Sequence, residues 1–291
     1  MIKIIFRESW RLVLKNRKFI FLLWGTNVAL ALVLTIPVFS MLQEFLQHSN
    51  WSNLLALNFN YFWLEQFLNS NKNIFDKLPL LFMSIIGINV LLQQLYQGGL
   101  IAVLNNPKKN HISDFFYSGV KFWYRFVKVS LIVLLTYILL FIVNTKIDAL
   151  ILSVTQKINS VSLDLLLRTI KYLVLLFLIG IISLFSEYVR IYIVLKDIVK
   201  IWKAVKYILV FLRQKFVLVF TVFFLVSLIG AAGAVIYNLV AILIPRSPFY
   251  FLILTFILQQ MLIIFRLVIT MFLYATEVYI FTDQDAEIIY K

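Results

Sequence analysis

Six long apolar runs dominate the chain, and shorter segments rich in basic and polar residues separate them. A helix needs roughly 20 apolar residues to cross the hydrocarbon core of a bilayer, so each run predicts a transmembrane helix. We therefore expect an all-α integral membrane protein that forms a single membrane domain over residues 1–291. The expected spans are 19–41, 79–104, 126–144, 172–195, 216–244 and 249–281.

Composition supports this class, because 63% of the residues are hydrophobic and only 14% are charged. A soluble domain has about a quarter charged residues. The net charge is +14, and the basic residues lie in the segments beside the apolar runs. These segments alternate along the chain between rich and poor in basic residues. The four segments on one side, 1–18, 105–128, 187–215 and 266–291, carry twelve of these net positive charges. By the positive-inside rule, both termini are expected in the cytoplasm.

This charge placement favours a membrane surface over nucleic acid as the partner of the basic residues. The Ile-, Lys- and Asn-rich usage suggests a bacterial inner membrane. The chain has no cysteine and two histidines, which excludes disulfides, thiolate chemistry and a His-rich metal site. No phosphate-binding glycine loop or G-x-S-x-G motif occurs. We therefore expect no enzyme activity, no cofactor and no metal.

Three basic and aromatic stretches, 6–15, 114–125 and 197–206, each lead into an odd-numbered span. Their cations recur every three or four residues, which places them on one face of a helix. The pattern predicts amphipathic helices on the inner membrane surface that contact anionic phospholipids or a protein partner. The cations expected to form this surface are Arg7, Arg11, Lys15, Lys121, Arg125, Lys128, Lys200, Lys203 and Lys206.

The even-numbered spans also end in similar sequences, which suggests an internal repeat. We expect three parallel units, each an inner-surface helix followed by a helical hairpin, at 1–112, 113–196 and 197–281. An acidic C-terminal tail, 282–291, would follow them.

The outer segments differ in length. Segment 42–78 has many aromatic residues among Asn, Gln and Ser, which fits either an interfacial helix on the outer leaflet or an aromatic-anchored loop. Segment 145–171 shows the same pattern more weakly. The third outer segment is expected to be a tight turn at 245–248.

Polar residues within the inner halves of the even-numbered spans are the candidate site, because polar groups in a bilayer usually face the bundle interior. They predict one shared patch that holds a solute, a lipid headgroup or a proton. The alternatives are buried pairing of Glu187 with Arg190 or Arg266, and side chains that reach the interface. Gly98–Gly99 fits a kink, a close crossing or a broken helix. The expected patch comprises Gln93, Gln94, Gln97, Gly98, Gly99, Glu187, Arg190, Gln259, Gln260, Arg266 and Glu277.

Gly98–Gly99, the stretch 114–119 with its basic continuation and the stretch 197–206 together carry a family resemblance. The chain resembles the six-span membrane domain fused to some bacterial glycerophosphodiester phosphodiesterases, and related uncharacterised bacterial six-span proteins. The resemblance implies the fold and transfers no functional residue. We expect this chain to differ from the fused proteins in lacking a catalytic domain after Lys291.

The leading expectation for function is a non-catalytic membrane subunit or scaffold. Its basic cytoplasmic face and acidic tail would hold lipids, a protein partner or another copy of the chain. The alternative is a transporter or lipid-handling protein that uses the polar patch. An intramembrane enzyme that uses Glu187 and Arg190 is the third and weakest hypothesis.

Overall fold

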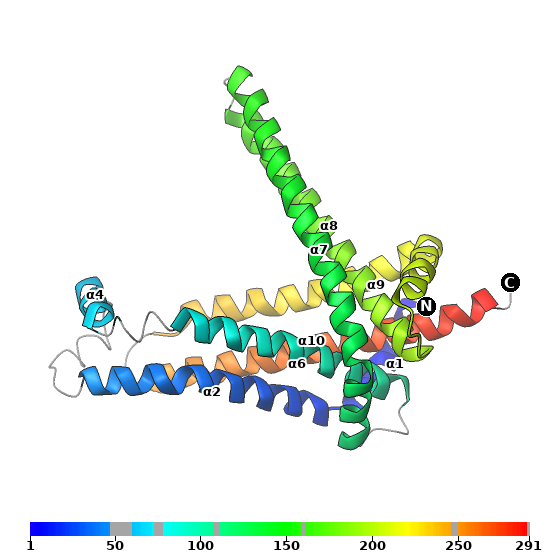
Figure 1. Cartoon of the computed structure of the whole chain (residues 1–291), viewed down its shortest axis with the longest axis horizontal. Helices are drawn as coiled ribbons and strands as arrows, with labels where there is room; N and C mark the ends of the chain where they lie inside the picture. Colours follow the sequence, from blue (N-terminus) through cyan, green and yellow to red (C-terminus); the bar gives the residue numbers. More distant parts are fainter. Residues whose placement is uncertain are drawn as a thin grey trace. The chain divides into compact units, whose positions relative to one another are not determined.

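The computed structural model describes residues 1–46, 60–70, 72, 78–106, 111–158, 161–245 and 250–289. Every regular element within these ranges is a helix (Figure 1). Six of the helices are long and apolar enough to cross a membrane, which confirms the predicted all-α, six-span fold. The six are α2 (Lys18–Leu46), α6 (Leu78–Asn105), α7 (Ile112–Ile158), α8 (Val161–Leu195), α9 (Ile201–Leu243) and α10 (Tyr250–Ile289), and two shorter helices are α1 (Ile2–Lys15) and α4 (Tyr61–Ser70).

The three basic stretches join their spans in different ways. A short turn separates α1 from α2, and the buried Asn16 side chain donates a hydrogen bond of 3.0 Å to the Leu12 carbonyl at the end of α1. The Asn16 backbone amide donates to the same carbonyl at 3.2 Å, so Asn16 caps the last turn of α1 with two hydrogen bonds. The second stretch continues into α7 without a break. The third begins α9, which kinks at Lys215, where φ is −118° and ψ is 18°.

Helices α7 and α8 form a long antiparallel hairpin, seen side by side in green in Figure 1. Residues 145–158 belong to α7 and residues 161–171 belong to α8, so the helices continue past the span ends expected at 144 and 172. The place of segment 145–171 on the outer side stays a prediction. This stretch has no Gly or Pro to end a helix, and Asp148 of α7 pairs with Lys171 and Arg168 of α8 across the hairpin.

The other outer segments are described in part. Within 42–78, residues 61–70 form α4, whose first turn is capped by a 3.1 Å hydrogen bond from the Trp63 amide to the Asn60 side chain. Trp63 and Phe67 stack within it at 5.3 Å. Its place on the outer leaflet stays a prediction. The turn expected at 245–248 lies largely outside the described residues, and α10 continues past the expected span end at 281.

The chain divides into two compact units. The first comprises Met1–Ser9, Gln97–Phe224 and Tyr274–Lys291, and the second comprises Trp10–Tyr96 and Leu225–Leu273. The three predicted repeats stay a prediction. The core of the first unit is aromatic: Tyr192 and Tyr207 stack at 4.4 Å, and Phe211 packs on Phe281 at 5.0 Å. This core holds the ends of α8, α9 and α10 together around the site described next.

Candidate functional site

The close approach of α6 to α7 depends on Gly99. A Cβ atom at this position would lie 2.6 Å from the Phe115 backbone oxygen, closer than real side chains allow. At Gly98 the nearest atom would be the Phe122 Cβ at 3.4 Å, an ordinary contact. Both glycines lie within the continuous helix α6, so a close helix crossing is the interpretation that fits. The crossing brings Gln97, at the edge of the first unit, toward α7.

A buried polar cluster lies in the first unit and draws on three helices. Helix α8 supplies Glu187, Tyr188 and Arg190, α10 supplies Tyr274 and Glu277, and α6 supplies Gln97. Tyr188 is 0% exposed, Glu277 2% and Arg190 9%. Polar groups this deeply buried normally each have a hydrogen-bond partner. The buried polar cluster, as we name these six residues, departs from that rule.

The carboxyl groups of Glu187 and Glu277 lie next to each other, close enough to share a hydrogen bond if a hydrogen atom lies between them. Oε2 of Glu187 and both carboxyl oxygens of Glu277 accept no hydrogen bond from an N–H or hydroxyl group of the described residues. Ser183, one turn before Glu187, faces the same carboxyl group. Two acidic side chains from different helices therefore meet here, Glu277 buried and Glu187 half-buried.

Arg190 is the nearby cation, but it points elsewhere. Its Nη2 donates a 3.0 Å hydrogen bond to Ser130 Oγ on α7, and its guanidinium carbon lies 5.9 Å from the centre of the Phe126 ring. Its Nε has no hydrogen-bond partner among the described residues. The hypothesis of a direct Glu187–Arg190 ion pair is wrong among the described residues, where Glu187 meets Glu277 instead.

The remaining residues of the expected patch belong to the second unit. Gln260 accepts a 3.0 Å hydrogen bond from Trp24 Nε1 and so links α10 to α2. Gln94 donates to the Val90 carbonyl of its own helix at 3.4 Å. Gln93 is half-buried, whereas Gln259 and Arg266 are exposed. The structure thus brings together Gln97, Glu187, Arg190 and Glu277, and the single patch of eleven residues stays a prediction.

Sequence reasoning missed three hydroxyl groups of this region. Tyr188 and Tyr274 belong to the buried polar cluster, and Ser130 holds Arg190. Spacing offered a signal for two of them, because Tyr188 directly follows Glu187 and Tyr274 precedes Glu277 by three residues. Ser130 offered none, since its role depends on how α7 packs against α8.

Asp197 organises part of the predicted basic surface. It lies between α8 and α9 with a φ of 49° and accepts hydrogen bonds of 2.7 Å from both Lys121 and Arg125 of α7. Arg125 also donates to the Ile198 carbonyl at 3.2 Å. Hydrogen bonds from Lys121, the larger contribution, and from Arg125 hold the pKa of the Asp197 carboxyl below its usual value. Two of the predicted surface cations therefore fasten the α8–α9 connection.

Other cations of this surface stay available. Lys128, Lys200, Lys203 and Lys206 are exposed and form no ion pair with a described residue, and we call these four lysines the basic face. Arg7 and Lys15 of α1 are likewise exposed and form no such pair, and Arg11 is exposed.

A groove of ≈ 430 Å³ runs between α7 and α9 beside the basic face. Lys128 lies at its edge, with Nζ 4.2 Å from the centre of the Tyr124 ring. Trp202 is 68% exposed there. Leu131, Ile132, Val199 and Ile201 form the apolar part of the lining. A cation next to an exposed indole and an apolar floor matches the headgroup region of a bilayer.

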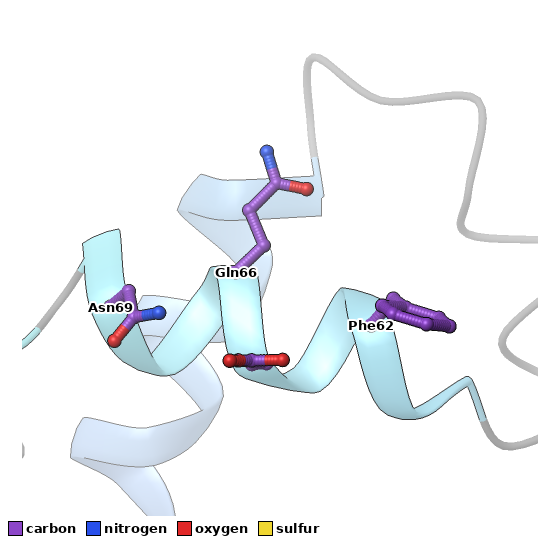
Figure 2. A pocket seen from close by; sticks show the side chains of 4 residues that line it. Phe62, Gln66 and Asn69 are labelled. Carbon is purple, nitrogen blue, oxygen red and sulfur yellow. The ribbon is translucent and has the colours of Figure 1, made fainter.

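Two other hollows are lined by none of the basic-face lysines. One follows α4, and Figure 2 shows that its lining side chains, Phe62, Gln66 and Asn69 among them, project from that single helix. The other is an apolar space of ≈ 320 Å³ inside the α7–α8 hairpin.

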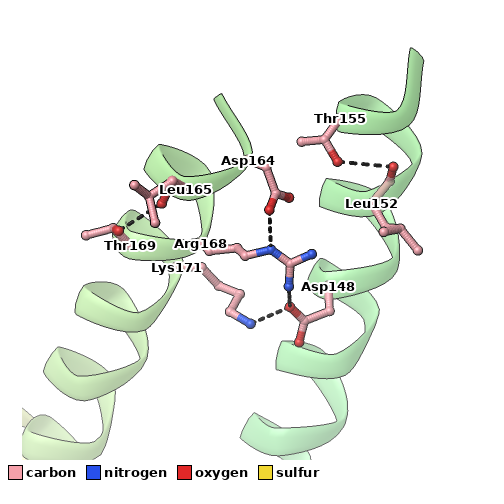
Figure 3. Close-up of polar contacts among 8 residues, drawn as sticks. All are labelled: Asp148, Leu152, Thr155, Asp164, Leu165, Arg168, Thr169 and Lys171. Carbon is pink, nitrogen blue, oxygen red and sulfur yellow. Dashed lines mark hydrogen bonds and ion pairs between the residues drawn. The ribbon is translucent and has the colours of Figure 1, made fainter. Parts of the chain in front are cut away.

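Beside this space, Lys171 donates to Asp148 (Figure 3). Arg168 donates to Asp164 at 2.8 Å and lies 4.0 Å from Asp148. We call these four residues the hairpin ion cluster.

Together, the fold and these polar residues define an all-α multi-pass membrane protein. Comparisons with known protein families, curated proteins and solved structures found no match. The resemblance to the membrane domain of glycerophosphodiester phosphodiesterases therefore stays a prediction, as does the function.

Proposed function

We propose that this protein is a non-catalytic membrane scaffold or subunit whose basic face lies on the cytoplasmic side of a bacterial inner membrane and binds anionic phospholipids. The observation that carries the proposal is the groove between α7 and α9, where Lys128 and Trp202 flank an apolar floor. Lys128 lines this groove, and Lys200, Lys203 and Lys206 are near its lining residues Ile201 and Trp202 in the sequence. None of these four lysines has an ion-pair partner among the described residues.

Both parts of a phospholipid have a counterpart here. Each basic residue near an anionic membrane surface contributes about 1 kcal/mol of attraction. Val199 and Ile201 offer an apolar wall for the start of an acyl chain, and the Trp202 ring suits the depth of the headgroups. The twelve net positive charges of the segments on this side support the same orientation.

Lipid binding at this face can be measured by native mass spectrometry of protein released from micelles that contain phosphatidylglycerol and phosphatidylcholine. We expect bound phosphatidylglycerol on the natural protein and at least about tenfold weaker binding for Lys128→Gln/Lys200→Gln/Lys203→Gln, from the loss of three attractions. The matched control is Lys3→Gln/Lys18→Gln/Lys146→Gln, which removes the same charge from exposed positions elsewhere.

Two results would contradict the proposal. One is equal retention of phosphatidylglycerol by both triple variants. The other is a stoichiometric protein that copurifies with the natural chain and is lost from the first variant alone, which would make the basic face the contact surface of a protein complex.

The buried polar cluster favours a second candidate function, a transporter or lipid-handling protein that uses this cluster as its site. Its unpartnered carboxyl oxygens are the observation in favour. In that case Glu187→Gln would abolish transport or ligand binding while the protein still assembled normally.

A further inference from the structure

Five oxygen atoms of the buried polar cluster have no hydrogen-bond partner among the described residues. They are Oε2 of Glu187, both carboxyl oxygens of Glu277, the Tyr188 hydroxyl and Oε1 of Gln97. The Tyr188 hydroxyl is fully buried and lies within electrostatic range of both carboxyl groups. A buried oxygen without a partner costs about 1–3 kcal/mol, so a group of five calls for something that contacts them.

The charges of the cluster do not cancel. Glu187 and Glu277 contribute two negative charges when ionised, and Arg190 contributes one positive charge. The other described groups that face the pair are neutral: Tyr188 and Ser183 of α8, Tyr274 of α10 and Tyr137 of α7, while Gln97 of α6 lies beside Tyr274. A net charge enclosed in a protein interior is costly unless a counter-charge accompanies it. One positive charge balances this cluster.

We propose that the Glu187–Glu277 pair is a binding site for one monovalent cation, either a proton or Na⁺. A proton would lie between the two adjacent carboxyl groups and supply the hydrogen that a bond between them needs. Na⁺ would be coordinated by the same carboxyl oxygens, with the Tyr188 hydroxyl available as a further ligand. The proposal is independent of lipid binding at the basic face, which shares no residue with this cluster.

The arrangement also makes a divalent metal a poor fit. A divalent ion would leave the cluster with one net positive charge when both carboxyl groups and Arg190 are ionised. It would also sit beside the Arg190 guanidinium, which has no other carboxylate to balance it among the described residues. Charge therefore selects a single monovalent cation.

The first experiment compares thermal unfolding of the natural protein in nanodiscs in NaCl, KCl and choline chloride, at one pH and one ionic strength. Bound Na⁺ raises the unfolding temperature with its concentration, because a ligand that binds only the folded state stabilises it. Infrared spectroscopy in choline chloride then tests for the C=O band of a protonated carboxylic acid. The variants are Glu277→Gln and Glu187→Gln, with Glu65→Gln as the control at an exposed position.

Two outcomes support the proposal and separate its two forms. A rise in unfolding temperature that is specific to NaCl, and is lost in Glu277→Gln but kept in Glu65→Gln, identifies Na⁺. No salt preference, together with a carboxylic acid band that disappears in Glu277→Gln or Glu187→Gln but not in Glu65→Gln, identifies a proton.

Equal unfolding temperatures in all three salts, without a band that either substitution removes, would overturn the proposal. The salt comparison on the natural protein keeps the test decisive if one variant fails to fold.

Discussion

The first unit contains two groups of charged side chains inside apolar surroundings, and they are built on opposite plans. The hairpin ion cluster pairs two acids with two bases, and each acid receives a hydrogen bond from a base (Figure 3). The buried polar cluster pairs an acid with an acid and turns its one base toward a serine. Only in the first do the charges of its described side chains cancel.

This difference separates a structural role from a binding role. A cluster in which charges cancel and donors match acceptors holds two helices together and needs nothing else. A cluster with surplus acid and unused oxygens is stable only with an additional positive charge. Changing the charge balance of each cluster in turn tests this difference.

The largest effect is expected when both acids of the buried polar cluster are removed. Glu187→Gln/Glu277→Gln leaves the Arg190 charge buried without a compensating acid, which we expect to lower the free energy of unfolding by about 3–5 kcal/mol. Each single substitution leaves one carboxylate to balance Arg190 and is expected to cost much less. Equilibrium unfolding in mixed micelles with increasing denaturing detergent measures the three variants.

The single variants are the internal control for this prediction, because each introduces one of the two amides that the double variant contains. If the double variant loses no more free energy of unfolding than the two single variants together, another group balances the charge of Arg190. The inference that the charges of the buried polar cluster do not cancel would then be wrong.

A smaller effect is expected in the hairpin ion cluster. Lys171→Met removes the buried donor from Asp148 and leaves this carboxylate with Arg168 at 4.0 Å. We expect a loss of about 2 kcal/mol, because a partly buried carboxylate loses its main hydrogen bond. Asp148→Asn in the same chain should recover part of it. The double-mutant cycle, measured by the same unfolding assay, is expected to give a coupling energy of about 1 kcal/mol.

Independent effects of Lys171→Met and Asp148→Asn would contradict a structural role for this pair. The hairpin would then owe its stability to apolar packing alone. Added NaCl should change these two variants and the natural protein equally, in contrast to the buried polar cluster if that cluster holds Na⁺.

The two clusters also show what the sequence can and cannot predict. Six spans follow from apolar length alone, so they were predictable. The extension of α7 to residue 158 and of α8 from residue 161 was not, because Asp148 and Lys171 look like loop residues until their pairing across the hairpin is known. A charged residue in a long helix can pair with a residue on another helix. The spacing of residues along one segment does not show which residue that is.

The same limit applies inside the buried polar cluster. Glu187, Arg190 and Glu277 stood out because charges are rare within apolar runs. The three-residue spacing of Glu187 and Arg190 on α8 suggested an ion pair between them. The packing of α7 against α8 instead places Arg190 in hydrogen-bond contact with Ser130. The sequence singled out Gly99, but only the structure shows its role, which is to leave room for the backbone of Phe115.

The smallest effect is expected at Asp197, the third and most exposed charge cluster of this unit. Asp197→Asn removes the carboxylate charge that Lys121 and Arg125 contact, and asparagine still accepts the φ of 49°. The Asp197 side chain is 52% exposed, so solvent screens both ion pairs. We expect a loss of about 0.2–1 kcal/mol at neutral pH and low salt, measured by the unfolding assay.

The pH dependence of this difference provides the sharper test. Lys121 and Arg125 lower the pKa of Asp197 in the folded protein, so its carboxylate stabilises the fold above the pKa it has when unfolded, about 3.9. This stabilisation is lost as the pH falls through the lowered folded pKa. The difference between the natural protein and Asp197→Asn should therefore shrink in acid and also in high salt, which screens exposed charges. A difference that persists under both conditions would instead assign Asp197 a role in the backbone turn, because only the electrostatic contribution responds to protons and to ions.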